Sequence, residues 1–157
     1  MSFEEIINKV IQHEGGYVND SLDKGGETNF GISKRWYPNV DIKNLSKEDA
    51  IAIYYRDYWK PSKAEKLPEH LQATYFDMCV NLGKSRATKI LQQAINSNKR
   101  SKIAVDGLIG DITIQSAVKL TKGRLQAYRC LFYAKIVQQQ PEQERFYYGW
   151  YKRALDV

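Results

Sequence analysis

Apolar residues recur every three to four positions along most of the 157-residue chain, and the strict apolar–polar alternation of half-buried strands is scarce. The spacing predicts a first helix over residues 3–14, whose apolar stripe includes Ile7 and Val10. The pair Gly15-Gly16 is expected to end this helix. The periodicity therefore predicts a mainly α fold.

The rest of the chain is expected to be helical after one irregular stretch. Residues 17–32 are rich in turn formers and predict a loop or small hairpin after the first helix. Later helices are predicted over residues 47–59, 68–82, 85–96, 111–120 and 124–140, and the aromatic tail is a candidate for one more. We expect Ser46, Ser85 and Asp111 to cap helices and Pro61 to close one.

The charge of the chain is unevenly distributed. Residues 79–140 hold 11 basic and 2 acidic groups, a net charge of +9, whereas residues 1–78 hold 10 basic and 13 acidic groups, a net charge of −3. Such a basic segment indicates a polyanionic partner: a nucleic acid, an anionic membrane or a phosphate-rich cell envelope. The alternative is a solvated face that only keeps the protein soluble.

The chain shows no targeting or membrane-spanning segment. It opens Met-Ser-Phe-Glu-Glu, without the basic start and apolar run of a secretory signal. No stretch approaches the roughly 20 apolar residues of a membrane span. We expect a protein made in the cytoplasm without stable membrane insertion, so that a role outside the cytoplasm needs release or non-classical export.

The candidate metal ligands do not form a recognisable site. In the loop after the first helix, Asp20 is followed by Leu22 and Lys24 where an EF-hand needs oxygen ligands. His13 and His70 have no partner at ligand spacing. The two cysteines lie in predicted helices and are expected to be core thiols. We therefore expect neither a metal nor another cofactor.

Glu14, the last residue of the first predicted helix, is a candidate general acid. At 100° per residue it extends the apolar line of Ile7 and Val10, so it should point toward the core. Desolvation and the negative end of the helix dipole would both raise its pKa. The loop that follows offers Asp20, Asp23, Glu27 and Thr28. The pattern is typical of a two-carboxylate site, and a helix-end glutamate turned toward solvent is the alternative.

Asp77 and Asn81 are the polar residues of an otherwise apolar helical stretch, residues 76–82. They share one ridge at i and i+4, so both need partners in a buried helix. One interpretation is a structural network that holds neighbouring loops. The other places Asn81 in a cleft, where its amide binds substrate.

The pattern of these residues resembles that of family 108 glycoside hydrolases, which are lysozyme-like N-acetylmuramidases of phages and bacteria. The similarity within residues 14–32 rests on Glu14-Gly15-Gly16-Tyr17, Asp20, Asp23, Gly25-Gly26, Thr28 and Gly31-Ile32. Further family-like positions are Tyr54-Tyr55, Trp59, Pro61, Phe76-Asp77, Val80-Asn81, Gly83 and Leu91-Gln92. Asp106-Gly107, Ile109-Gly110, Thr113, Phe146, Gly149-Trp150 and Arg153 resemble a peptidoglycan-binding lobe.

The resemblance implies a lysozyme-like helical fold with a catalytic lobe over residues 1–96 and a helical peptidoglycan-binding lobe packed on it over residues 97–157. It implies an endolysin-type muramidase that cleaves the β-1,4 bond between N-acetylmuramic acid and N-acetylglucosamine, with Glu14 as the catalytic acid. Substrate binding would fall to Asn81, whose partner would be an N-acetyl group, together with Tyr17 and Asp77. We expect a monomer.

The second catalytic group stays open between Asp23 and Asp20. Phage-type lysozymes use the spacing Glu-x8-Asp-x5-Thr; Glu14 to Asp23 keeps the first interval, and Asp23 to Thr28 is one residue shorter. We favour Asp23, with Thr28, acting through a water. Carboxyl groups about 5–5.5 Å apart suit retention of configuration, and about 6.5–9.5 Å suits inversion.

Two other functions compete with the muramidase. One is a non-catalytic cell-wall-binding or secretion-associated protein of the same fold. The other is a nucleic-acid binder that uses residues 84–124, but the chain holds no recognised nucleic-acid motif. We therefore expect peptidoglycan, and no nucleic acid, as the partner.

Overall fold

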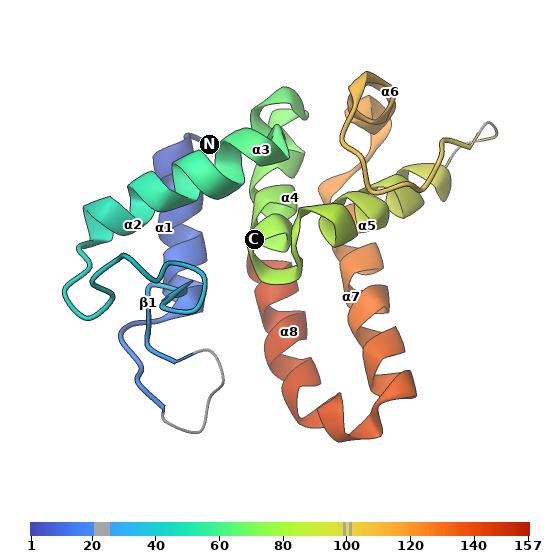
Figure 1. The fold of residues 1–157 in the computed structure, drawn as a ribbon. Coiled ribbons are helices and arrows are strands. Elements are labelled where there is room, and N and C mark those ends of the chain that lie inside the picture. Colours follow the sequence, from blue (N-terminus) through green and yellow to red (C-terminus); the bar gives the residue numbers. More distant parts are fainter. Residues whose placement is uncertain (21–25, 99, 101) are drawn as a thin grey trace. The chain divides into compact units, whose positions relative to one another are not determined.

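The computed structural model describes residues 1–20, 26–98, 100 and 102–157. They form two compact units, Met1–Asp57 and Tyr58–Val157 (Figure 1). The sequence places a lobe boundary between residues 96 and 97, and that boundary stays a prediction.

The first unit begins with α1 (Phe3–Glu14), which confirms the helix predicted there. Ser2 and Glu5 form a reciprocal capping box, so two of the otherwise unpaired backbone N–H groups of the first turn are satisfied. Ile7 and Val10 are fully buried. Burial of this apolar stripe fixes the rotation of α1 in its unit and therefore fixes the direction of Glu14.

A small antiparallel hairpin follows, made of β1 (Thr28–Asn29) and β2 (Ile32–Ser33). Its two loop residues, Phe30 and Gly31, both have positive φ angles, of 51° and 78°. Two-residue hairpin loops of this kind match the right-handed twist of their strands. Val18 forms an isolated bridge to β1. The hairpin predicted within residues 17–32 is confirmed.

The segment after the hairpin forms α2 (Lys47–Tyr54), the π-helix η1 (Tyr55–Trp59), α3 (Lys60–Ser62) and the 3₁₀-helix η2 (Ala64–Lys66). The Ser46 hydroxyl accepts a hydrogen bond from the Asp49 N–H, as predicted for a cap. The prediction for Pro61 is wrong. Pro61 lies in the first turn of α3, where a missing N–H is tolerated, and Lys63 ends the helix with a φ of 55°.

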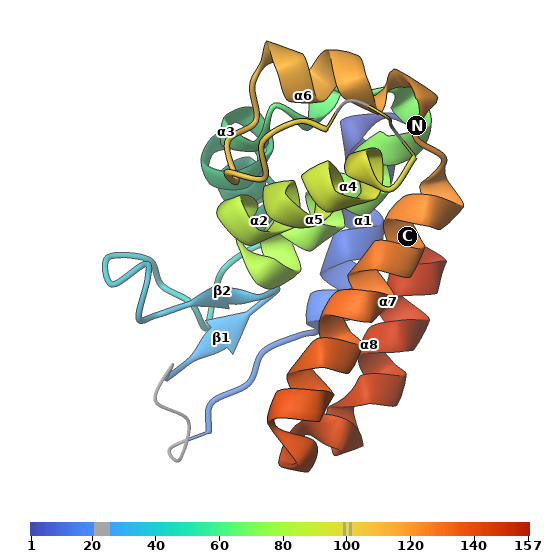
Figure 2. The same cartoon turned by 90° about the vertical axis from the view of Figure 1, so that its right-hand side faces the viewer.

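The second unit contains the longer helices: α4 (Glu69–Leu82), α5 (Lys84–Asn96), α6 (Asp111–Ser116), η3 (Ala117–Lys119), α7 (Lys122–Gln139), η4 (Pro141–Gln143) and α8 (Glu144–Asp156). α4 packs against α5 and α7, and α7 runs side by side with α8 (Figures 1 and 2). Leu71, Tyr75 and Phe76 are fully buried, so α4 is the central helix of this unit. The mainly α prediction is confirmed.

Two predicted caps in this unit are wrong. The N-caps of α5 and α6 are Gly83 and Gly110, and no side chain caps either helix. Ser85 instead lies so close to Gly107 that a Cβ atom added at Gly107 would be 2.6 Å from Ser85 Oγ. Gly107 has a φ of 76°, which favours glycine, and only a residue without a side chain leaves room for Ser85 at this position.

The buried amide of Gln92 binds several groups of the basic loop before α6. Gln92 donates to Asp106 Oδ1 at 2.8 Å and to the Leu108 carbonyl at 3.2 Å, and accepts from the Gly107 N–H at 3.0 Å. Gln92 Nε2 also lies 3.2 Å from Thr113 Oγ1.

Within the described ranges, no helix is both long and apolar enough to cross a membrane.

Candidate functional site

Glu14 lies at the C-terminal end of α1 and is partly buried. Gly15 follows with a φ of 84°, and its N–H donates to the Ile11 carbonyl at 3.1 Å, so the last turn of the helix is closed behind Glu14. The chain changes direction immediately after the carboxylate. Glu14 is therefore held on a hydrogen-bonded helix end.

The hairpin turn approaches Glu14 closely. A Cβ atom added at Gly31 would lie 2.8 Å from Glu14 Oε2, 2.9 Å from Glu14 Cβ and 2.5 Å from Tyr54 Oη. The Tyr54 hydroxyl donates to the Phe30 carbonyl at 2.8 Å, which ties the turn to α2. The Glu14 carboxylate and the buried Tyr54 hydroxyl thus meet at the backbone of Gly31.

Two other predicted site residues, Tyr17 and Thr28, belong to the segments that the Val18 bridge joins to β1. The bridge between Val18 and Thr28 has two N–H···O bonds of 2.8 Å, so Thr28 belongs to the same small sheet. The Tyr17 hydroxyl donates to Glu27 Oε1 at 2.9 Å, and this hydrogen bond raises the pKa of Tyr17. The segment that carries Tyr17 is therefore anchored to the hairpin.

The two candidates for the second catalytic group are Asp20 and Asp23. Asp20 is exposed at the end of the segment that follows Val18. Asp23 lies outside the described residues. Both assignments stay predictions.

Asp77 is fully buried in the second unit between two arginines. Arg129 Nη2 donates to Asp77 Oδ2 at 2.6 Å, and Arg153 Nη2 donates to Asp77 Oδ1 at 2.8 Å. Burial on its own would raise the pKa of Asp77, but the hydrogen bonds from Arg153 and the charge of Arg129 lower it below the usual range. A fully buried carboxylate has no surface for a ligand, so Asp77 fits the structural network that the sequence left open.

Asn81, one turn further along α4, is connected to the same network. The hydroxyl of Tyr133 donates to Asn81 Oδ1 at 2.5 Å and accepts from Arg129 Nε at 3.1 Å. Asn81 is partly buried, whereas Arg129 and Tyr133 are fully buried. Asn81 is therefore the outermost member of a chain that begins at Asp77.

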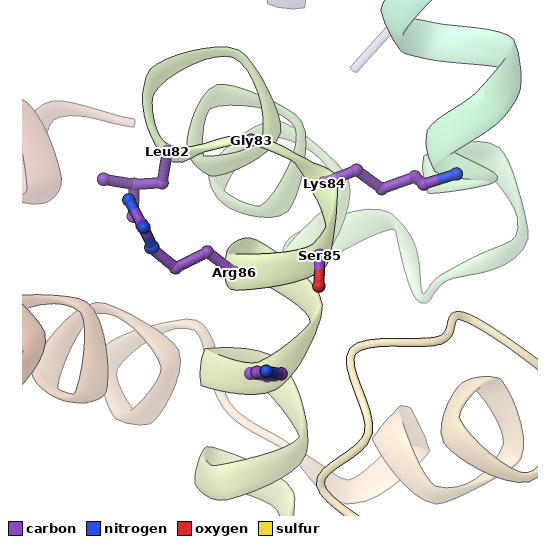
Figure 3. Close-up of a pocket in the computed structure, with 6 residues that line it drawn as sticks. Leu82, Gly83, Lys84, Ser85 and Arg86 are labelled. Carbon is purple, nitrogen blue, oxygen red and sulfur yellow. The ribbon is translucent and has the colours of Figure 1, made fainter.

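A basic pocket opens at the junction of α4 and α5 (Figure 3). It has a volume of about 440 Å³ and is lined by Leu82, Gly83, Lys84, Ser85, Arg86 and Lys89. Lys84 and Arg86 extend to different sides of the first turn of α5 (Figure 3), and the Arg86 guanidinium lies 5.7 Å from the Phe132 ring centroid. This turn holds no acidic residue, so the helix dipole adds to the positive field of the pocket.

The other titratable residues considered as site candidates are a histidine and two cysteines, and their contacts and burial are those of structural residues. His70 Nε2 lies 2.7 Å from the Leu120 carbonyl oxygen. Burial raises the pKa of Cys79 to about 12, as expected for a core thiol, and Cys130 is partly buried. In the part of the chain that the structure describes, no three His, Cys, Asp or Glu side chains are grouped to hold a metal ion.

Comparison with known proteins assigns both halves of the chain. The family model of glycosyl hydrolase 108 matches residues 7–83, and a model described as a predicted peptidoglycan domain matches residues 86–155. The chain therefore combines a segment of glycosyl hydrolase family 108 with a peptidoglycan domain. It is a glycoside hydrolase that acts on peptidoglycan, and the family resemblance read from the sequence is confirmed.

A solved structure supports the fold. The chain is similar to SagA of Brucella abortus, with a TM-score of 0.77 and 27% sequence identity over 98% of this chain and 90% of that chain. The predicted lysozyme-like, mainly α fold is thereby confirmed. No curated protein matches the chain significantly.

Sequence reasoning missed the residues that hold Glu14 and Asn81 in place. Gly31 and Tyr54 appear among the family-like positions, but nothing in the sequence indicates that they meet at Glu14. Arg129 and Tyr133 are four residues apart on α7, and the i, i+4 spacing is the one available signal that they act together.

Proposed function

We propose that the chain is a muramidase that hydrolyses the β-1,4 bond between N-acetylmuramic acid and N-acetylglucosamine. Glu14 is the general acid that protonates the glycosidic oxygen of the leaving sugar. The observation that carries this proposal is the place of Glu14: a hydrogen-bonded helix end, packed against a hairpin turn, inside the segment that matches a hydrolase family.

A general acid must be held in one geometry, because loss of alignment costs rate steeply. The closed last turn of α1 and the backbone of Gly31 hold Glu14 in place, and the Tyr54 hydroxyl fixes the turn that carries Gly31. A glutamate at a frayed helix end would have none of these contacts. This packing favours a catalytic role over the solvent-facing alternative.

For the second group we propose Asp23, which with Thr28 would hold the attacking water on the opposite face of the sugar. Asp20 is the competing carboxylate. A water-mediated step by Asp23 corresponds to inversion of the anomeric centre, and direct attack by a carboxylate corresponds to retention.

Wall docking is proposed for the basic pocket at the α4–α5 junction. Its support is a concave surface with three cationic side chains and an uncapped helix start. Such a surface fits the carboxylates and phosphates of a cell wall. We also propose that the protein reaches the wall by release from the cytoplasm or by non-classical export.

The Glu14→Gln variant tests the catalytic assignment. It keeps the size of the side chain but removes the transferable proton, so hydrolysis of purified peptidoglycan should fall by about 10²-fold or more. Glu4→Gln, on the exposed face of the same helix, is the matched control and should hydrolyse like the parent protein. Equal rates for Glu14→Gln and the parent would show that Glu14 is not the acid, and would favour a non-catalytic wall-binding protein.

Mass analysis of the released products tests the bond and the mechanism. New reducing ends on N-acetylmuramic acid identify a muramidase, whereas new reducing ends on N-acetylglucosamine contradict the proposed bond. The anomer that forms first, observed by NMR before mutarotation because anomers have equal mass, distinguishes a water held by Asp23 from a covalent intermediate.

A further inference from the structure

The network around Asn81 has a fixed hydrogen-bond direction. An arginine side chain is always a donor, because its guanidinium stays protonated in proteins. Arg129 gives one N–H to Asp77 and one, from Nε, to the Tyr133 oxygen. The Tyr133 oxygen therefore accepts at this contact.

Tyr133 has one proton, and its contact with Arg129 leaves that proton free to donate. Burial raises the pKa of Tyr133, so its hydroxyl stays protonated. The only other partner of the hydroxyl among the described residues is Asn81, at 2.5 Å. The atom of Asn81 that faces Tyr133 must therefore be the carbonyl oxygen Oδ1, and the amide nitrogen Nδ2 must face away from it.

Among the described residues, the two N–H donors of the partly buried Asn81 amide thus have no acceptor. A donor with no protein acceptor at the outer end of a rigid chain suits an incoming acceptor oxygen. Peptidoglycan, the substrate of this hydrolase, carries such oxygens on its acetamido groups and on its peptides.

A purely structural role does not explain the choice of an amide here. Among the described residues, the buried Arg129 Nη1 has no hydrogen-bond partner. An aspartate at position 81 would accept the Tyr133 hydrogen bond equally well, and its charge would lie one side chain away from the Arg129 guanidinium. What the asparagine alone supplies is a donor.

We propose that Arg129 and Tyr133 are positioning residues that orient Asn81 as a hydrogen-bond donor to an acceptor oxygen of peptidoglycan. The inference rests on the proposed function only in taking peptidoglycan as the ligand of Asn81, and it does not depend on Glu14. Asn81 makes the contact, and Tyr133 selects which end of its amide is presented.

Binding experiments in a Glu14→Gln background test this inference without consuming the substrate. The key variant is Asn81→Asp, which keeps an acceptor for the Tyr133 hydroxyl but has no donor. We expect its unfolding temperature to equal or exceed that of the background protein, and its Kd for soluble peptidoglycan oligomers to rise about fivefold or more. If Asn81 has only a structural role, Asn81→Asp binds as tightly as the background, and the inference is wrong.

A double-mutant cycle tests the positioning role of Tyr133. Tyr133→Phe keeps the ring but frees the Asn81 amide to rotate, so the Kd should rise about two- to fivefold. In an Asn81→Ala background the same substitution should leave the Kd unchanged. An equal Kd increase in both backgrounds would mean that Tyr133 acts on the fold in general, and would overturn its positioning role.

The ligand probe and the catalytic assay separate the remaining outcomes. Glycan strands freed of their peptides report on acetamido oxygens, and intact oligomers report also on peptide carboxylates. A loss of affinity of both Asn81→Asp and the uncharged Asn81→Ala for both probes assigns the acceptor to the glycan, and a loss by both variants for intact oligomers alone assigns it to the peptide. Residual hydrolysis by Glu14→Gln would contradict the acid assignment without affecting these binding results.

Discussion

Replacement of Gly31 by alanine tests whether the hairpin turn positions Glu14. Gly31 has a φ of 78°, which L-residues rarely adopt, and the added methyl group would fall 2.5 Å from Tyr54 Oη and 2.8 Å from Glu14 Oε2. Ordinary contacts of a Cβ atom begin near 3.4 Å. The alanine therefore forces a shift in the turn, in the carboxylate or in both.

The expected size of the effect follows from these two terms. The left-handed conformation costs a non-glycine residue roughly 1–2 kcal/mol. Relief of the contact with Glu14 requires a movement of about 0.6 Å at the carboxylate, since 3.4 Å less 2.8 Å is the overlap. Misplacement of about 1 Å costs on the order of 10²-fold in rate. We expect Gly31→Ala to lose about 1–3 kcal/mol of unfolding free energy and about 10- to 100-fold of hydrolytic rate.

Gly16→Ala is the matched control for the assay. Gly16 lies in the same segment, its φ is not positive, and a Cβ atom there would meet nothing within 4 Å. Hydrolysis of purified peptidoglycan is measured for both variants at a temperature where thermal unfolding shows each to be folded. Gly16→Ala should retain near-parental rate and stability.

A double variant separates strain in the turn from displacement of the acid. Tyr54→Phe removes the oxygen that lies closest to the new methyl group and leaves both contacts with Glu14, but it also removes the hydrogen bond to the Phe30 carbonyl. Gly31→Ala should therefore cost less stability when it is added to Tyr54→Phe than when it is added to the parent, and it should cost about as much rate in both backgrounds. If Gly31→Ala hydrolyses peptidoglycan as fast as Gly16→Ala, the turn does not position Glu14 and the reasoning is refuted.

The second unit provides two further predictions. Asp77→Asn removes the buried carboxylate that both Arg129 and Arg153 bind, so it should cost about 3–5 kcal/mol of unfolding free energy in urea titrations. Because the pKa of Asp77 is lowered in the folded state, its stabilisation is present above about pH 4 and is lost as the pH falls further; Asp77→Asn should lack that acid dependence. In the pocket, the double variant Lys84→Gln/Lys89→Gln should sediment less with peptidoglycan than the parent at low salt. The exposed control Lys135→Gln should sediment like the parent. Equal sedimentation of the parent, the double variant and the control would exclude docking by the pocket.

Local patterns predict the elements of this fold better than their ends. The helix over residues 3–14 is confirmed at both ends, because an apolar stripe and a glycine pair are both local signals. The caps of α5 and α6 are not predictable in the same way. Ser85 is a good capping residue by type, yet its hydroxyl lies against Gly107, a contact that depends on how a distant loop folds back.

Counting charges along the sequence also gives the wrong expectation for Arg129, because it treats this residue as part of a basic surface. Arg129 contributes to the surplus of +9 in residues 79–140, but it is fully buried and pairs with Asp77. An arginine on a long helix is usually exposed. The carboxylate that pairs with Arg129 lies on a different helix, α4, so the sequence around Arg129 does not reveal it. The polar pair Asp77 and Asn81 did indicate that partners were needed, and the partners themselves became visible only in the folded chain.

The same ion pairs bear on how the two halves of this hydrolase depend on each other. Asp77 lies in the segment that matches the hydrolase family, and Arg129 and Arg153 lie in the segment that matches the peptidoglycan domain. A chain cut between residues 83 and 86 would leave Asp77 without either arginine and both arginines without their carboxylate. Because an unpaired buried charge costs several kcal/mol, a large share of the stability of a typical domain, α4 is energetically part of the peptidoglycan domain. The boundary between the family models is therefore not a boundary between independently stable bodies.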